Sequence, residues 1–228
     1  MKKTNKRLLI SGAGLIAAFV IWTVLVCHVD VRAIGPNESS VGFATLNGYI
    51  HRLTGVNMLL YVITDWLGLV PIGVAFGFAL LGLVQCIKRK SILKVDRSIL
   101  ALGVFYTVVM AVYLLFEIVV INYRPTIIDG VLEVSYPSST TMLVTSVMPT
   151  AMIQLNARIK NGLFRRCVTV AAAVFTGFTV IGRVLSGVHW ITDIIGGGLF
   201  STGVVMIYCG VCDLGARKVS RETHTCCK

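Results

Sequence analysis

Three ionisable residues near the C-terminal end of the chain have types and spacings that suit phosphate chemistry. They are Arg183, His189 and Asp193, and they lie between two long apolar runs. Ionisable side chains inside or at the edge of a membrane are costly and typically functional. A carboxylate four residues after an imidazole lies one helical turn away, where it can accept the proton on one ring nitrogen and leave the other free to attack. A planar guanidinium group can grip a phosphate.

Residues upstream supply possible partners for this group. Pro137 is followed by four hydroxyl residues, a pattern typical of a helix start, where the hydroxyls cap free amide groups. The same amide groups, with the hydroxyls of Ser138 and Ser139, can instead form a cradle for an anion. Arg124, which precedes a proline, can contact lipid headgroups or can close a two-arginine clamp with Arg183 on a phosphoryl group. Polar residues at helix ends are often only snorkelling or capping groups, so both interpretations stay open here.

The composition indicates which elements must position these residues. The chain has 228 residues, of which 56% are hydrophobic and only 14% are charged, whereas a soluble domain carries nearer a quarter charged residues. Its mean hydropathy is +0.84. Apolar runs long enough to cross about 30 Å of hydrocarbon recur along the whole sequence. We therefore expect a single all-α membrane domain over residues 1–228, with six transmembrane helices at roughly 8–28, 66–87, 99–120, 141–157, 167–186 and 191–212.

The distribution of charge predicts the orientation of these helices. The net charge is +11, and 17 of the 21 basic residues fall in the N-terminus, the second and fourth junctions and the tail. That side of the membrane would carry +14, and the other side −3. The positive-inside rule then places both termini in the cytoplasm of a cell-membrane protein. The basic excess is a topology signal with anionic lipid headgroups as its partners, which argues against nucleic acid binding.

This topology brings the candidate polar groups to one membrane depth. The third and fifth helices end outside near Arg124 and Arg183, and the fourth and sixth begin outside near Ser138 and His189. We therefore predict a six-transmembrane helical bundle with its active site at the extracytoplasmic ends of helices three to six. The segment from about Leu46 to Asp65 is expected to form a helix along the membrane surface.

The three segments resemble the signature motifs of the type 2 phosphatidic acid phosphatase superfamily. They are Arg124-Pro125, Pro137-Ser138-Ser139-Thr140, and Arg183 followed by His189 and Asp193. Members of this family are integral membrane lipid phosphatases that share an active site with vanadium haloperoxidases. The resemblance implies that His189 is the nucleophile that forms a phosphohistidine and that Asp193 orients it. It also implies that Arg124, Arg183, Ser138 and Ser139 hold the phosphate oxygens and that neither a metal nor another cofactor is needed.

Two departures from the family pattern bear on activity, and in addition Gly182 stands where the third motif has a serine. Glu117 stands where the family has a phosphate-binding lysine, and Thr140 stands where it has the histidine that protonates the leaving oxygen. An alcohol leaving group has a pKa of about 16 and needs that proton. A phosphate monoester leaving from a diphosphate has a second pKa of about 6 and can depart without it. The sequence therefore favours an isoprenoid diphosphate, such as an undecaprenyl diphosphate-like lipid, over phosphatidic acid.

Two other functions compete with a lipid phosphatase. Glu117 and Thr140 are also compatible with a catalytically silent relative that binds lipid phosphates without hydrolysing them. A transporter is the third possibility, but a transporter would bury polar groups near the bilayer midplane. Here the ionisable groups cluster at helix ends, with Glu117 only about two turns inside.

Overall fold

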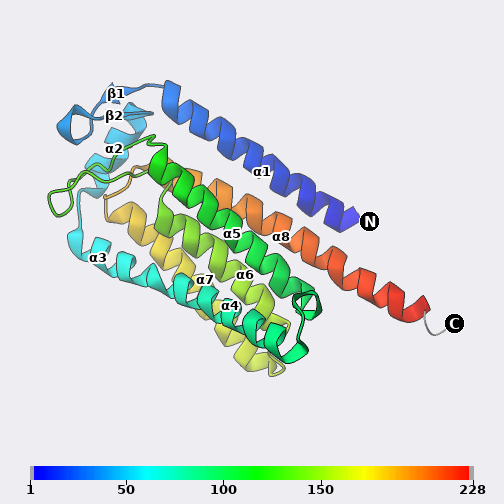
Figure 1. The fold of residues 1–228 in the computed structure, drawn as a ribbon. Helices are drawn as coiled ribbons and strands as arrows, with labels where there is room; N and C mark the ends of the chain where they lie inside the picture. Colours follow the sequence, from blue (N-terminus) through cyan, green and yellow to red (C-terminus); the bar gives the residue numbers. More distant parts are fainter. Residues whose placement is uncertain (1–2, 226–228) are drawn as a thin grey trace.

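A computed structural model describes the backbone of residues 3–225 and the side chains of residues 5–212. The chain is almost entirely helical (Figure 1). The helices are α1 Lys3–His28, α2 Ala44–Thr54, α3 Met58–Leu67, α4 Leu69–Arg89, α5 Arg97–Ile118, α6 Ser139–Asn156, α7 Gly162–Leu185 and α8 Ile191–Thr225. A two-stranded antiparallel ribbon, β1 Arg32–Ala33 with β2 Ser40–Val41, and the short 3-10 turns η1 Pro36–Glu38 and η2 Ile92–Lys94 complete the described elements.

Five helical segments in the described part of the chain are long and apolar enough to cross a membrane. They correspond to α1, α3 with α4, α5, α7 and the first part of α8, and this composition makes the chain an integral membrane protein. α6 is the exception among the six expected spans, because its hydroxyl residues lower its hydropathy. Its 18 residues rise about 27 Å, close to the thickness of a bilayer core. The sixth span therefore remains a prediction.

α6 lies inside the bundle, which explains its polar composition. It packs against α4, α5, α7 and α8, and ten of its residues are buried. Several of its polar side chains form hydrogen bonds within the bundle. The Thr150 hydroxyl donates to the Ser146 carbonyl at 2.9 Å and lies 3.2 Å from the Tyr106 hydroxyl. A helix surrounded by protein can carry such groups, because their hydrogen bonds are satisfied locally.

The segment before the second span differs from the sequence-based expectation. The single surface helix expected from about Leu46 to Asp65 is two helices, α2 and α3, separated at Gly55, whose φ of 62° is readily adopted only by glycine. α3 then leads into α4 with only Gly68 between them. The apolar helical stretch therefore runs from Met58 to Arg89 and begins well before the expected residue 66.

α1 packs mainly on α8 through a close approach of two glycines. A Cβ on Gly12 would lie 2.8 Å from the Gly203 carbonyl oxygen, and a Cβ on Gly203 would lie 3.1 Å from the Gly12 carbonyl oxygen. The absence of a side chain at Gly12 and Gly203 therefore allows the two helices to pack closely. In Figure 1, α1 and α8 run alongside each other at the upper edge of the bundle.

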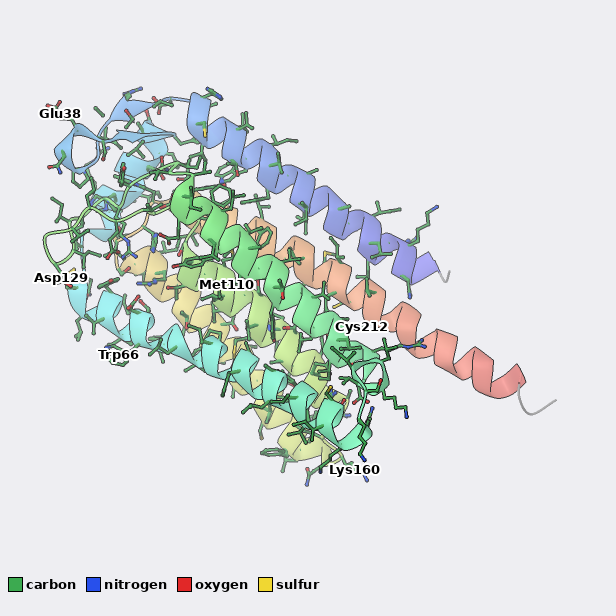
Figure 2. The ribbon with its side chains drawn as sticks, viewed as in Figure 1. Glu38, Trp66, Met110, Asp129, Lys160 and Cys212 are labelled. Carbon is green, nitrogen blue, oxygen red and sulfur yellow. The ribbon has the colours of Figure 1, made fainter. Side chains whose placement is uncertain are left out.

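The termini and the connections between helices are divided between the two ends of the bundle. Figure 1 shows the N-terminus, the α4–α5 and α6–α7 junctions and the C-terminal end of α8 at one end. The ribbon, α2 and the long α5–α6 loop lie at the other, and Figure 2 places Lys160 and Asp129 at these opposite ends. This arrangement agrees with the alternating topology expected from charge. The tail residues Arg217, Lys218, Arg221 and Lys228 contribute to that expectation, but they lie outside the described side chains.

Candidate active site

His189 lies in the short loop between α7 and α8, and Ser135 connects it to Asp193. The Nδ1 atom of His189 is 3.8 Å from Oδ2 of Asp193, which is too long for a hydrogen bond. Ser135 lies between the two: its Oγ is 3.1 Å from Nδ1 and donates to Oδ2. Because a hydroxyl has one proton, Ser135 must accept from an Nδ1–H group, which leaves the Nε2 lone pair free. The imidazole and the carboxylate, expected to interact directly, thus approach to 3.8 Å and are hydrogen-bonded through Ser135.

Asp193 is fully buried and is held by groups from three segments. Its Oδ2 accepts a hydrogen bond from the Trp190 backbone N–H at 2.9 Å, just before α8 begins. Its Oδ1 accepts from Nδ2 of Asn122 at 3.3 Å, and its backbone carbonyl accepts from the Ser138 N–H at 3.2 Å. These contacts tie the start of α8 to the α5–α6 loop and to the start of α6, so the loop that carries His189 is fixed from both sides.

Arg124 is positioned by a hairpin-like segment in the α5–α6 loop. Its backbone N–H donates to the Glu133 carbonyl at 3.0 Å, and an isolated bridge pairs Tyr123 with Val134. Nε1 of Trp190 donates to the Tyr123 carbonyl at 2.7 Å, which joins this segment to the His189 loop. The guanidinium group is nearly buried, and its Nη2 forms an ion pair with Glu133 at 3.0 Å.

Arg183 reaches the same region from the last turn of α7. Its side chain is 1% exposed, and its Nη2 forms an ion pair with Asp65 of α3 at 2.7 Å. The same nitrogen donates to the hydroxyl of Thr140 at the start of α6. The guanidinium carbons of Arg183 and Arg124 lie 5.1 and 5.6 Å from the centre of the Tyr61 ring. One aromatic ring of α3 thus contacts both arginines.

Several buried polar atoms of these residues have no hydrogen-bonding partner in the part of the chain that the structure describes. Among the described residues, Nε and Nη1 of both Arg124 and Arg183, Oγ of Ser138 and Nε2 of His189 are buried and have no hydrogen-bonding partner. A cavity of about 440 Å³ lies beside His189 and Arg124. Its lining includes His189, Arg124, Ser139, Glu117 and Glu133. His189, Arg124 and Ser139 thus line one cavity together with Glu117. Arg183 and Ser138 are not part of this lining, and Arg183 instead contacts Thr140 and Tyr61.

Burial sets the charge state of the imidazole. It lowers the pKa of His189 to about 4, and the positive charges of Arg124 and Arg183 act in the same direction against the opposing effect of Asp193. At neutral pH His189 is consequently a neutral imidazole, the form that can act as a nucleophile.

Comparisons with known proteins bear on the family and the fold. The family model of the PAP2 superfamily matches residues 101–212, which contain all the expected site residues, so this part of the chain is similar to that superfamily. A similar solved structure is the crystal structure described as the first transmembrane PAP2-type phosphatidylglycerolphosphate phosphatase from Bacillus subtilis. It has a TM-score of 0.61 and 18% identity, covering 90% of this chain and 96% of that chain. At this identity the likeness concerns the fold. No curated protein matches the sequence.

Four residues of the site were not expected from the sequence. Ser135 and Asn122 lie in the α5–α6 loop, and Tyr61 and Asp65 lie on α3. Ser135 comes only two residues before Pro137, so its place beside a motif is a signal that could have pointed to it. Tyr61 and Asp65 carry no such signal, because α3 reaches the site only through its packing against α7.

Proposed function

We propose that this protein is a membrane lipid phosphatase that releases phosphate from a lipid phosphate or diphosphate. One observation carries this proposal. Of the twelve buried side-chain nitrogen and oxygen atoms without a hydrogen-bonding partner among the described residues, six belong to Arg124, Arg183, Ser138 and His189. Buried polar groups are normally paired. Four guanidinium nitrogen atoms, a hydroxyl and a free imidazole nitrogen suit an anion with several oxygens.

The proposed first step forms a phosphohistidine. The Nε2 lone pair of His189 attacks phosphorus, the bond from phosphorus to the leaving oxygen breaks, and the electron pair departs with that oxygen. The two arginines, Ser138 and Ser139 hold the non-bridging oxygens and stabilise their charge in the transition state. Asp193, acting through Ser135, stabilises the positive charge that develops on the ring.

The proposed second step regenerates the imidazole. Water attacks phosphorus from the side that the leaving group vacated, the P–N bond breaks, and its electron pair returns to Nε2. The proton of the water passes to solvent, and inorganic phosphate leaves. Side chains of this chain suffice for both steps, so the proposed reaction proceeds without a metal ion.

The surroundings of Thr140 support a diphosphate as the substrate. Its hydroxyl accepts a hydrogen bond from Arg183, and a threonine hydroxyl is far too weak an acid to protonate an alkoxide near neutral pH. A leaving lipid monophosphate needs no such proton, because its second pKa is about 6. We therefore propose an isoprenoid diphosphate as the preferred substrate, reached from the extracytoplasmic side with both termini in the cytoplasm.

Phosphate release from two lipids tests the proposal. Purified full-length protein in detergent should release phosphate faster from farnesyl diphosphate than from dioctanoyl phosphatidic acid. His189→Ala should abolish both reactions, and His28→Ala, which changes an exposed histidine outside the cavity lining, serves as the matched control. Faster turnover of phosphatidic acid would reject the diphosphate preference. A folded wild-type protein that binds either lipid but releases no phosphate would instead establish the alternative, a lipid phosphate binder without hydrolytic activity.

A further inference from the structure

Each arginine of the candidate site is paired with a carboxylate at its rim. Arg183 pairs with Asp65 at 2.7 Å and Arg124 pairs with Glu133 at 3.0 Å. The arginine side chains are 1% and 10% exposed, whereas the carboxylate side chains are 53% and 42% exposed. The arginine end of each ion pair is therefore buried, and the carboxylate end is exposed.

α3 contributes two neighbouring contacts to this arrangement. Tyr61 and Asp65 are four residues apart and lie on the same face of the helix. The ring of Tyr61 contacts both guanidinium groups, and the carboxylate of Asp65 neutralises one of them. Two buried positive charges near each other would repel, and an unpaired buried charge is strongly unfavourable. The ring and the carboxylates offset both costs while the site holds no anion.

A bound phosphate would also compensate the buried positive charges of the two arginines. Its negative charge would reach the arginines through Nε and Nη1, the atoms that have no protein partner. The carboxylates on Nη2 would then lie one guanidinium group away from an anion of the same sign. The arginines would attract the phosphate while Asp65 and Glu133 opposed it, so the affinity of the site depends on both.

We propose that Asp65 and Glu133 are counter-ions that weaken the binding of phosphate and so speed the release of the inorganic product. This inference rests on the proposed function, because it requires the arginine pair to bind phosphate. The two carboxylates act through the arginines and are positioning residues. Their presence lets the arginines stay buried in the empty site without making the site a trap for the phosphate that each turnover produces.

Binding of inorganic phosphate and of orthovanadate to purified full-length protein tests this role. Asp65→Asn and Glu133→Gln remove one negative charge each and keep the shape of the side chain. Each variant should bind both anions about tenfold more tightly, the size expected for removing a like charge from a partly screened position. Asp65→Glu should restore the wild-type dissociation constant. Asp30→Asn removes a carboxylate that pairs with Arg32 at 2.7 Å outside the cavity lining, and it should leave anion affinity unchanged.

The direction of the change in anion affinity distinguishes a counter-ion from a residue that only maintains the structure of the site. Damage to the site would weaken anion binding, whereas loss of a counter-ion should strengthen it. Folded Asp65→Asn and Glu133→Gln variants with unchanged or weaker anion affinity would overturn the inference and leave the proposed function standing. If Asp65→Asn fails to fold, Glu133→Gln decides, because Arg124 retains some exposure to solvent. A folded wild-type protein that releases no phosphate from either lipid would overturn the proposed function itself.

Discussion

His189 and Asp193 are joined through the hydroxyl of Ser135 and not directly. Their closest side-chain atoms, Nδ1 and Oδ2, are 3.8 Å apart, and Ser135 Oγ bonds to both. This bridge fixes the proton on Nδ1 and keeps the Nε2 lone pair on the cavity side. Ser135 comes from the α5–α6 loop, so the orientation of the imidazole depends on a segment more than fifty residues away in the chain.

Replacing Ser135 should therefore slow the reaction without removing the nucleophile. In Ser135→Ala, Nδ1 and Asp193 would lose their bridge, and kcat should fall by about tenfold to a hundredfold, as is usual when a group that orients a reacting histidine is lost. The measurement is phosphate release at saturating lipid diphosphate. Ser146→Ala is the matched control, because Ser146 is also buried but lies within α6 and has no hydrogen-bonding partner for its hydroxyl among the described residues. Equal kcat in both variants would remove Ser135 from the mechanism.

The low pKa of His189 predicts a stability loss in mild acid. Its folded-state pKa of about 4 lies below the usual 6.5, so the unfolded chain binds the proton first as the pH falls. The contribution is fully present above pH 6.5 and is lost progressively between 6.5 and 4, amounting to roughly 3 kcal/mol over the whole window. Thermal unfolding should show a steeper decline between pH 7 and pH 5 for wild type than for His189→Gln. Parallel declines for the two proteins would contradict a depressed pKa.

The turn before His189 should tolerate no side chain at Gly187. Its φ is +65°, and an added Cβ would lie 1.7 Å from the carbonyl oxygen of Gly55 in the α2–α3 loop. Gly187→Ala should therefore displace this loop or the His189 loop and lower both Tm and phosphate release, the latter by more than tenfold because the reacting groups are misplaced. Gly198→Ala is the control, since its Cβ would meet nothing within 4 Å, and alanine favours the helix. Similar activity in the two variants would show that the loop contact is dispensable.

The aromatic ring of Tyr61 should contribute more to substrate binding than its hydroxyl does. Its ring lies near both guanidinium groups, and cation–π contacts contribute about 0.5–2 kcal/mol each. Tyr61→Leu should raise KM by about fivefold or more, whereas Tyr61→Phe should stay close to wild type. Steady-state kinetics with a lipid diphosphate distinguishes these cases. Equal KM values for the two variants would mean that the ring does not hold the arginines.

The helices and the membrane class could be predicted from the sequence because both depend on local composition. Runs of apolar residues of sufficient length predict spans, and α1, α5, α7 and the membrane part of α8 lie close to their expected positions. The break between α2 and α3 was missed. It depends on one glycine, and the apolar pattern continues on both sides of it.

Some residues of the candidate site could also be predicted, because they lie close together in the sequence. His189, Asp193 and Arg183 lie within eleven consecutive residues, and the residue types alone indicate phosphate chemistry. The sequence thus determined which groups were available, the helices that carry them and the end of the bundle where they gather. Only the tertiary structure decided that Ser135 separates the imidazole from its carboxylate and that Tyr61 and Asp65 hold the arginines. Such contacts join segments distant in the chain, and they arise from how the helices pack, which spacing along the sequence does not encode.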